Sequence, residues 1–128
     1  MNFDFLEDMD NDDKEIEIQY HPQNQEDALR LKKFIEYQMQ TIDVVDENNQ
    51  IKKIRLAMIY YVHYHQQKIT IYGKNETYLC YQFWDSISNL FENLYFVEVR
   101  KDIFINHYHI KDIQSEYIVL DNGQILSI

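Results

Sequence analysis

The sequence predicts a mostly β fold, a strand-rich α+β domain of small packed antiparallel sheets with two helices. Aromatic and β-branched side chains favour strands, and the 128 residues include 11 Tyr and 7 Phe against 2 Gly and 1 Pro. Short segments of alternating apolar and polar residues follow one another closely, and strands joined by short turns pair in the antiparallel direction. The length fits one domain.

The N-terminal part predicts a strand followed by a helix. Residues 14–20 alternate between apolar and polar, and Pro22 ends this strand because it lacks the backbone donor. Apolar residues then recur at helical spacing, which predicts an amphipathic helix at about 24–39. We interpret residues 14–49 as a strand-helix extension of a single domain that spans residues 14–128.

The sequence predicts that residues 50–128 form the core of the domain, with short strands joined by polar turns. Residues 65–67 form the tip of one predicted hairpin, and Asn122-Gly123 is a strong signal for another. Apolar residues at helical spacing predict a second, short helix at about 83–92. An apolar aromatic segment covers 57–64, and the predicted strands are 41–46, 50–56, 68–72, 76–81, 96–100, 103–106, 110–114, 117–121 and 124–128.

The net charge of −10 comes entirely from the first half of the chain. Residues 1–50 contain 14 acids and 4 bases, whereas residues 51–128 contain 8 of each. Six of the acids and no base lie within residues 1–13, which predicts a disordered acidic leader that aids solubility or serves as an interaction tail. The second half is therefore mixed in charge and compatible with a local basic patch.

No arrangement of residues in the sequence predicts an active site. Two glycines cannot supply a phosphate-binding loop or a dinucleotide fingerprint, and no serine stands in a G-x-S-x-G context. Cys80 lies in a strand pattern, where we expect it to face the core. We therefore predict a protein that is not an enzyme and needs no cofactor.

Two histidine pairs are the candidates for a metal site. His63 and His65, and likewise His107 and His109, share a strand face if both segments are extended, and imidazoles bind zinc and related ions. Neither pair has an acid at matching spacing. We therefore predict exposed histidines and no metal site.

The expected compartment follows from targeting features and cysteine content. Residues 1–13 have no basic residue and no apolar run of signal length, and no stretch reaches the ~18 apolar residues of a membrane span. The single cysteine cannot form an internal disulfide, which fits a reducing compartment. We expect a cytoplasmic protein that is not embedded in a membrane.

Basic residues of the second half cluster in three places that could contact nucleic acid. Cations carried by loops on a β scaffold can reach phosphates and base edges. A net-acidic chain repels a polyanion at long range, so charge by itself favours DNA binding only weakly. The candidate cations are Lys52, Lys53, Arg55, Lys68, Lys74, Arg100 and Lys101.

The most distinctive stretch of the second half is Phe96-Val97-Glu98-Val99-Arg100-Lys101-Asp102-Ile103-Phe104-Ile105-Asn106, followed by Ile110. Together with the order of the predicted elements, it resembles the LytTR DNA-binding domain of bacterial transcription regulators. Residues 96–106 resemble the family signature F-x-R-x-x-K-S-x-x-V-N, with Lys101 at the lysine and Asn106, which we expect to cap the following turn, at the last position. Glu98 and Asp102 stand where the signature has arginine and serine. The order of elements agrees over the predicted domain, and the N-terminal strand-helix resembles that of short stand-alone members without a receiver domain.

The resemblance implies a sequence-specific DNA-binding transcriptional regulator. In that family, loops from one side of small packed sheets enter successive major grooves of double-stranded DNA at direct repeats, which implies a homodimer or two copies paired on DNA. The family's three contact regions correspond here to the hairpin tip, with His65, Gln67 and Lys68, to the segment with Arg100 and Lys101, and to the segment after the last strand.

An alternative from a different class is a protein–protein regulator on the same scaffold. Such a protein has lost direct DNA binding and acts on a regulator or a membrane-bound partner through its aromatic surface and its acidic N-terminus. The net charge of −10 favours it, as do Glu98 and Asp102, which bring negative charge beside the contact loop. The sequence also ends at Ile128, before the basic segment that follows the last strand in the family.

Overall fold

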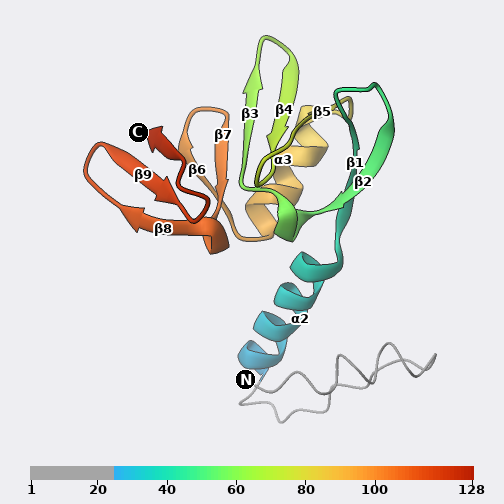
Figure 1. Cartoon of the computed structure of the whole chain (residues 1–128). Helices are drawn as coiled ribbons and strands as arrows, with labels where there is room; N and C mark the ends of the chain where they lie inside the picture. The colour runs from blue at the N-terminus through green and yellow to red at the C-terminus, as the bar shows by residue number, and fades with distance from the viewer. Residues whose placement is uncertain (1–24) are drawn as a thin grey trace, which may run out of the picture. The chain divides into compact units, whose positions relative to one another are not determined.

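The computed structural model describes residues 25–128, which contain two α-helices and ten strands (Figure 1). The predicted leader at 1–13 and the predicted strand at 14–20 lie outside the described residues. The helix predicted at about 24–39 is present as α2 (Gln25–Met39). In the part of the chain that the structure describes, neither helix has the length and apolar character needed to cross a bilayer.

The chain divides into two units between Lys32 and Lys33. Of the first unit the structure describes residues 25–32, which form the first part of α2. There Arg30 lies 3.5 Å from the carboxylate of Glu26 and 3.4 Å from that of Asp27, one helical turn away. Both pairs are exposed, so they contribute little to stability.

Seven antiparallel strands form the larger sheet of the second unit, in the order β2-β1-β5-β4-β3-β7-β6. Six of them agree with the predicted strands to within one residue at each end. The exception is β3, which begins inside the apolar segment at 57–64, after the 3₁₀ turn η2 (Leu56–Met58). The strands are β1 (Thr41–Val45), β2 (Ile51–Arg55), β3 (Tyr61–His65), β4 (Lys68–Tyr72), β5 (Thr77–Cys80), β6 (Phe96–Arg100) and β7 (Ile103–Asn106).

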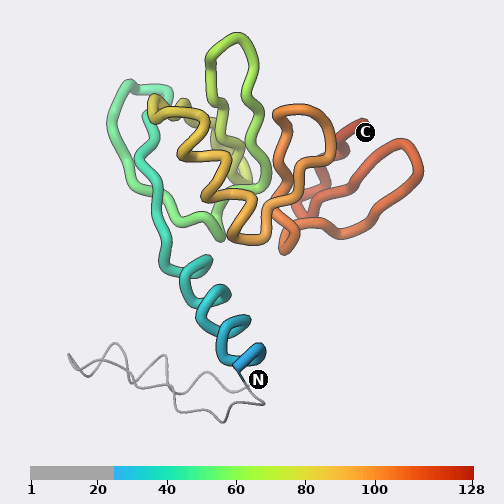
Figure 2. The backbone as a smooth tube through the Cα atoms, turned by 180° about the vertical axis from the view of Figure 1, so that it is seen from behind, coloured from blue at the N-terminus to red at the C-terminus, as the bar shows by residue number. Residues whose placement is uncertain are grey.

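One face of the larger sheet packs against the second helix, α3 (Trp84–Asn93), and forms the main core (Figure 2). Alternate strand residues point to this face, so their buried side chains meet Ile87 and Phe91 of the helix. Trp84 stacks on Tyr64 of β3 with ring centroids 4.7 Å apart, which fixes the first turn of α3 on the sheet. The buried strand residues of this core include Ile42, Val44, Val62, Ile69, Ile71, Cys80, Phe96 and Phe104.

A smaller sheet of three strands covers one end of the opposite face. It consists of β8 (Ile110–Ile113), β9 (Tyr117–Leu120) and β10 (Ile125–Ser127), in the order β10-β9-β8. The predicted turn at Asn122-Gly123 joins the last two strands, and Gly123 has a φ of 90°, which a glycine adopts without strain. A second core forms between the sheets from Tyr60, Tyr61, Ile105, Ile118 and Leu120.

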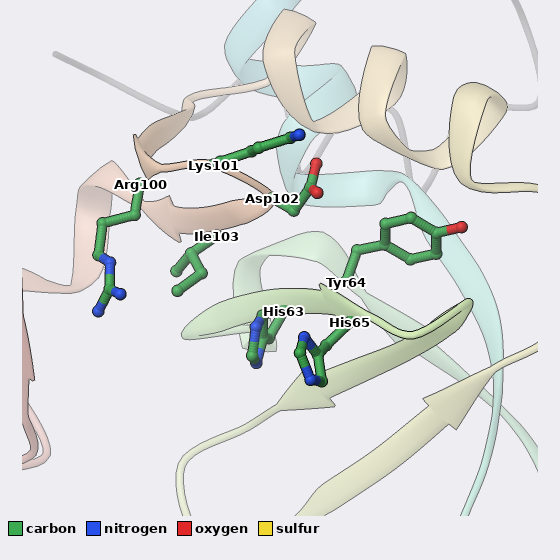
Figure 3. Close-up of a pocket in the computed structure, with 7 residues that line it drawn as sticks. All are labelled: His63, Tyr64, His65, Arg100, Lys101, Asp102 and Ile103. Atoms are coloured by element: carbon green, nitrogen blue, oxygen red, sulfur yellow. The ribbon is translucent and has the colours of Figure 1, made fainter.

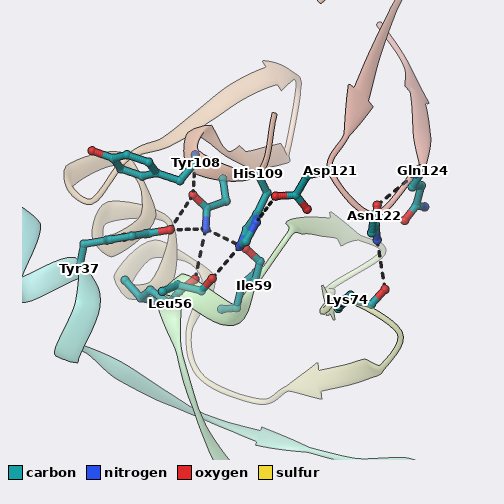
Figure 4. A network of polar contacts seen from close by, with 11 residues as sticks. Tyr37, Leu56, Ile59, Lys74, Tyr108, His109, Asp121, Asn122 and Gln124 are labelled. Atoms are coloured by element: carbon teal, nitrogen blue, oxygen red, sulfur yellow. Dashed lines mark hydrogen bonds and ion pairs between the residues drawn. The ribbon is translucent and has the colours of Figure 1, made fainter. Parts of the chain in front are cut away.

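Asn106 is a polar residue that the core buries completely, with 0% of its surface exposed. Its amide nitrogen donates to the carbonyls of Ile59 (2.9 Å) and Leu56 (3.4 Å) and to the hydroxyl of Tyr37 (2.8 Å) (Figure 4). Its carbonyl oxygen accepts from that hydroxyl and from the backbone N–H of Tyr108, so the predicted cap of the following turn is confirmed. One side chain therefore joins α2, η2 and β7.

The ring of His109 also ties the two sheets together. One ring nitrogen lies 2.9 Å from the carboxylate of Asp121 (Figure 4), and the other lies 2.7 Å from the carbonyl of Ala57. The ring also stacks on that of Tyr60, with centroids 3.9 Å apart. Burial and the hydrogen bond to Asp121 raise the pKa of Tyr60 to about 12. Burial acts to raise the pKa of Asp121, but hydrogen bonds from His109 and Tyr60 outweigh it, so that pKa lies below 3.8.

Replacing the buried amide should destabilise the fold strongly. Asn106→Ala leaves the partners of the amide unpaired inside the core, so we expect the free energy of unfolding to fall by roughly 2–4 kcal/mol in urea denaturation. The matched control, Tyr37→Phe, removes one hydroxyl and should cost roughly 1–2 kcal/mol. Equal losses for the two variants would show that the amide does not organise this junction.

Acid should weaken the link between the sheets. Because the pKa of Asp121 is lower in the folded protein than its ordinary 3.8, the ionised carboxylate stabilises the fold at neutral pH, and this contribution is lost as the pH falls through the folded-state value. The difference in free energy of unfolding between the wild type and Asp121→Asn should therefore shrink from about pH 5 to about pH 2. A constant difference, as expected for the exposed Glu116→Gln, would contradict this.

Candidate nucleic-acid interface

Strand β3 joins the two hairpins that carry the predicted contact residues. It pairs with β4 on one side, where His65 faces Lys68, and with β7 on the other, where His63 faces Ile103. The backbone N–H of Tyr64 also donates to the carbonyl of Asp102 at 2.9 Å, which continues the pairing into the β6–β7 turn. The tips of both hairpins therefore lie at the same end of the larger sheet (Figure 1).

The β3–β4 hairpin turns through two residues. The predicted tip was 65–67, but His65 belongs to β3 and is the register partner of Lys68, so the turn is Gln66-Gln67. Both glutamines have positive φ, 50° and 64°, the combination that matches the twist of a two-residue hairpin. Neither is Gly or Asn, so each costs on the order of 1 kcal/mol to hold there.

The β6–β7 hairpin turns through Lys101 and Asp102, and Asp102 has a φ of 62°. The backbone N–H of Asp102 donates to the carboxylate of Glu98 at 3.0 Å. The strand register shifts between Glu98 and Arg100, which marks a β-bulge just before the turn. Two hydrogen bonds therefore hold this turn, one within the hairpin to Glu98 of β6 and one from Tyr64 of β3.

A pocket of about 490 Å³ opens between the two hairpins. Arg100, His63 and His65 point to one side in the close-up, whereas Lys101 extends away from Arg100 (Figure 3). The rings of the two histidines lie 5.4 Å apart, because residues two positions apart share a strand face. The lining residues are His63, Tyr64, His65, Arg100, Lys101, Asp102 and Ile103.

The structure brings most of the predicted contact residues together. His65, Arg100 and Lys101 line one pocket, Lys68 is the cross-strand partner of His65, and Gln67 stands exposed in the adjoining turn. The pocket does not gather their charges on one side, since Lys101 points away from Arg100. If Lys101 contacts DNA, it must therefore do so from a different side than Arg100.

The two lysines of β2 differ from the basic residues at the hairpin tips because they form ion pairs. Lys52 lies 3.3 Å from the carboxylate of Asp46, and Lys53 lies 3.0 Å from that of Asp43. Within residues 25–128, the ion pairs closer than 4 Å do not include Lys68, Arg100 or Lys101. The tip cations are therefore more available for a polyanion than Lys52 and Lys53, although the predicted cluster at 52–55 is the denser one in sequence.

The acids beside the tips reduce the attraction of this site for a polyanion by a small amount. Glu98 is exposed, and two unit charges about 10 Å apart in water interact by about 0.4 kcal/mol, less in salt. A direct hydrogen bond from a charged side chain is stronger, about 1.5–3 kcal/mol. One such hydrogen bond from a tip cation to a polyanion would therefore exceed a repulsion of this size.

Two further side chains reach this end of the sheet without having been predicted as contacts. His63 lines the pocket beside His65. Tyr81 is 75% exposed and follows Cys80, the register partner of Ile69, which places it next to Lys68. Strand alternation counted from the hairpin turn could have indicated both, because it places side chains two positions apart on one face.

The other candidate chemistries have no supporting geometry in the part of the chain that the structure describes. No group of three His, Cys, Asp or Glu side chains gathers there as a metal centre would require, and His63 and His65 stand as a pair. Cys80 faces the core as predicted, and burial raises the pKa of its thiol, which makes it a poor nucleophile.

The structure defines a two-sheet β domain with exposed cations at two hairpin tips, and comparison with known proteins identifies its family. The LytTr DNA-binding domain model matches residues 49–128, more than half of the chain, so the chain belongs to the LytTR family. The same fold occurs in the LytTr DNA-binding domain of a protein described as a methyl-accepting/DNA response regulator from Bacillus cereus. That match has 15% identity and a TM-score of 0.56, and it covers 68% of this chain and 84% of the other. No curated protein sequence matches the chain.

The strained hairpin turn should be open to stabilisation. Gln66→Asn combined with Gln67→Gly supplies the residues that adopt these φ values at low cost, so we expect the free energy of unfolding to rise by about 1 kcal/mol in thermal or urea denaturation. Ser115→Gly, at a turn residue without positive φ, is the control and should lower it. A loss of stability in the double variant would contradict the turn geometry.

Proposed function

We propose that the protein is a sequence-specific regulator of transcription that binds double-stranded DNA with the two hairpin tips at one end of its larger sheet. The observation that carries this proposal is the shared register of the hairpins through β3, closed by the hydrogen bond from Tyr64 to Asp102. This register presents Lys68, Arg100 and Lys101 as exposed cations from two rigid tips. Membership of a family of DNA-binding domains supports the same conclusion.

The side chains at the tips suit the major groove. A groove about 12 Å wide admits a two-stranded β-ribbon, and an arginine can donate two hydrogen bonds to a guanine. Arg100 is therefore the proposed base-reading residue, and Gln67 at the turn can pair in the same bidentate way with an adenine. Lys68 and His65 lie across the hairpin from each other, where they contact phosphates.

Lys101 contributes from the other side of the tip. Because it points away from Arg100, it contacts the phosphates that flank the groove rather than the same base step. A single tip region covers a short site, so two copies of the domain bind direct repeats, about one helical turn apart. Binding that depends on these phosphate contacts weakens as the salt concentration rises. The repulsion between DNA and the net charge of −10 is strongest at low salt, where it is screened least.

The test measures fluorescence anisotropy of labelled duplexes enriched from a random pool, at several salt concentrations. Lys68→Ala, Arg100→Ala and Lys101→Ala should each weaken binding roughly tenfold, and the loss of a phosphate contact should reduce the salt slope by about 1. Arg100→Ala should in addition relax the preference at one base position. Lys111→Ala, an equal charge change on the smaller sheet, is the matched control and should bind as the wild type does.

Two results would contradict the proposal. One is an equal effect of the tip variants and of Lys111→Ala, which would show that only net charge matters. The other is no binding of any duplex by the folded protein at about 50 mM salt, where phosphate contacts are strongest. The second result would favour the protein–protein regulator in its place.

A further inference from the structure

The β-bulge in β6 decides which way Arg100 points. Residues two positions apart in a regular strand share a face, so Arg100 would lie on the same face as Glu98. The register shifts between them instead: Glu98 faces the buried Phe104, on the side of α3, and Arg100 faces Ile103, on the side of His63. The extra residue thus turns Arg100 to the face on which the pocket opens.

Two acids hold this bulged turn in shape. The carboxylate of Glu98 accepts the backbone N–H of Asp102 at 3.0 Å and so closes the loop across the bulge. Asp102 has a φ of 62°, a conformation that Asp and Asn tolerate better than most residues other than Gly. Its carbonyl accepts from Tyr64 of β3, so both of its backbone polar groups are fixed.

We propose that Glu98 and Asp102 are positioning residues, which maintain the bulged β6–β7 turn and thereby aim Arg100 and Lys101 at DNA. This proposal rests on the proposed function. On this proposal, the negative charge of the two acids beside the cations lowers DNA affinity slightly. The turn geometry that the two acids maintain raises DNA affinity by more. Neither residue touches DNA itself.

Two variants of Glu98 separate the effect of its charge from its effect on the turn geometry. Glu98→Gln keeps an acceptor oxygen on a side chain of the same length and removes the charge. Glu98→Ala removes the same charge and the acceptor. If geometry dominates, Glu98→Gln should bind DNA as tightly as the wild type or several-fold more tightly, whereas Glu98→Ala should bind several-fold more weakly. Asp102→Asn and Asp102→Ala form a second pair with the same expected order, because Asn tolerates the positive φ.

The experiment combines DNA affinity with the amide proton signal of residue 102. In the full chain, nuclear magnetic resonance should show this amide proton downfield and slow to exchange in the wild type and in Glu98→Gln, and shifted upfield and fast to exchange in Glu98→Ala. Glu92→Gln and Glu92→Ala, near the end of α3, are the matched controls and should leave both readouts unchanged.

Each outcome decides the matter. An equal rise in DNA affinity for Glu98→Gln and Glu98→Ala would overturn the proposal, since charge alone would then account for the effect. If even the wild type binds no DNA at low salt, the proposed function fails while the amide signal still tests the turn. In that case the aiming of cations at DNA fails with the proposed function. Loss of the signal in Glu98→Ala with retention in Glu98→Gln then supports only the part of the proposal that Glu98 maintains the turn, and an unchanged signal in both overturns that part as well.

Discussion

The pairing of β3 with strands on both of its sides is the constraint on which the proposed DNA-binding end depends. A hairpin alone would be free to splay, but β3 is hydrogen-bonded to β4 and to β7, and Tyr64 extends the second ladder to the β6–β7 turn. Packing holds the strand in place, because Val62 is fully buried and Tyr64 stacks on Trp84 of α3. Two loops far apart in the sequence thus act as one rigid surface.

Local geometry matters more than net charge for the function proposed for this surface. The charge of −10 lies in the first half of the chain, while the second half is balanced. Within the second half, the lysines of β2 are paired with acids, and the cations at the hairpin tips have no such partner among residues 25–128. A polyanion that approaches the tips therefore meets cations that do not have to break an existing ion pair.

Much of the fold could be predicted from the sequence because alternation and turn residues are local signals. The strands at 68–72, 96–100 and 103–106 and the cap by Asn106 are such features. The hydrogen bond between Asn106 and Tyr37 joins residues 69 positions apart, which no local pattern reveals. The bulge before Arg100 and the positive φ at Gln66-Gln67 also lack the usual Gly or Asn signal, so the direction of the contact side chains needed the structure.

The most direct test of the account is a titration of isotope-labelled protein with duplex DNA, followed through backbone amide chemical shifts. If the shared register of the two hairpins forms the binding surface, residues 65–68 and 98–103 should shift together and saturate at the same DNA concentration. Residues 110–120 of the smaller sheet should stay largely unchanged. Shifts confined to one hairpin, or concentrated on the smaller sheet, would contradict the account.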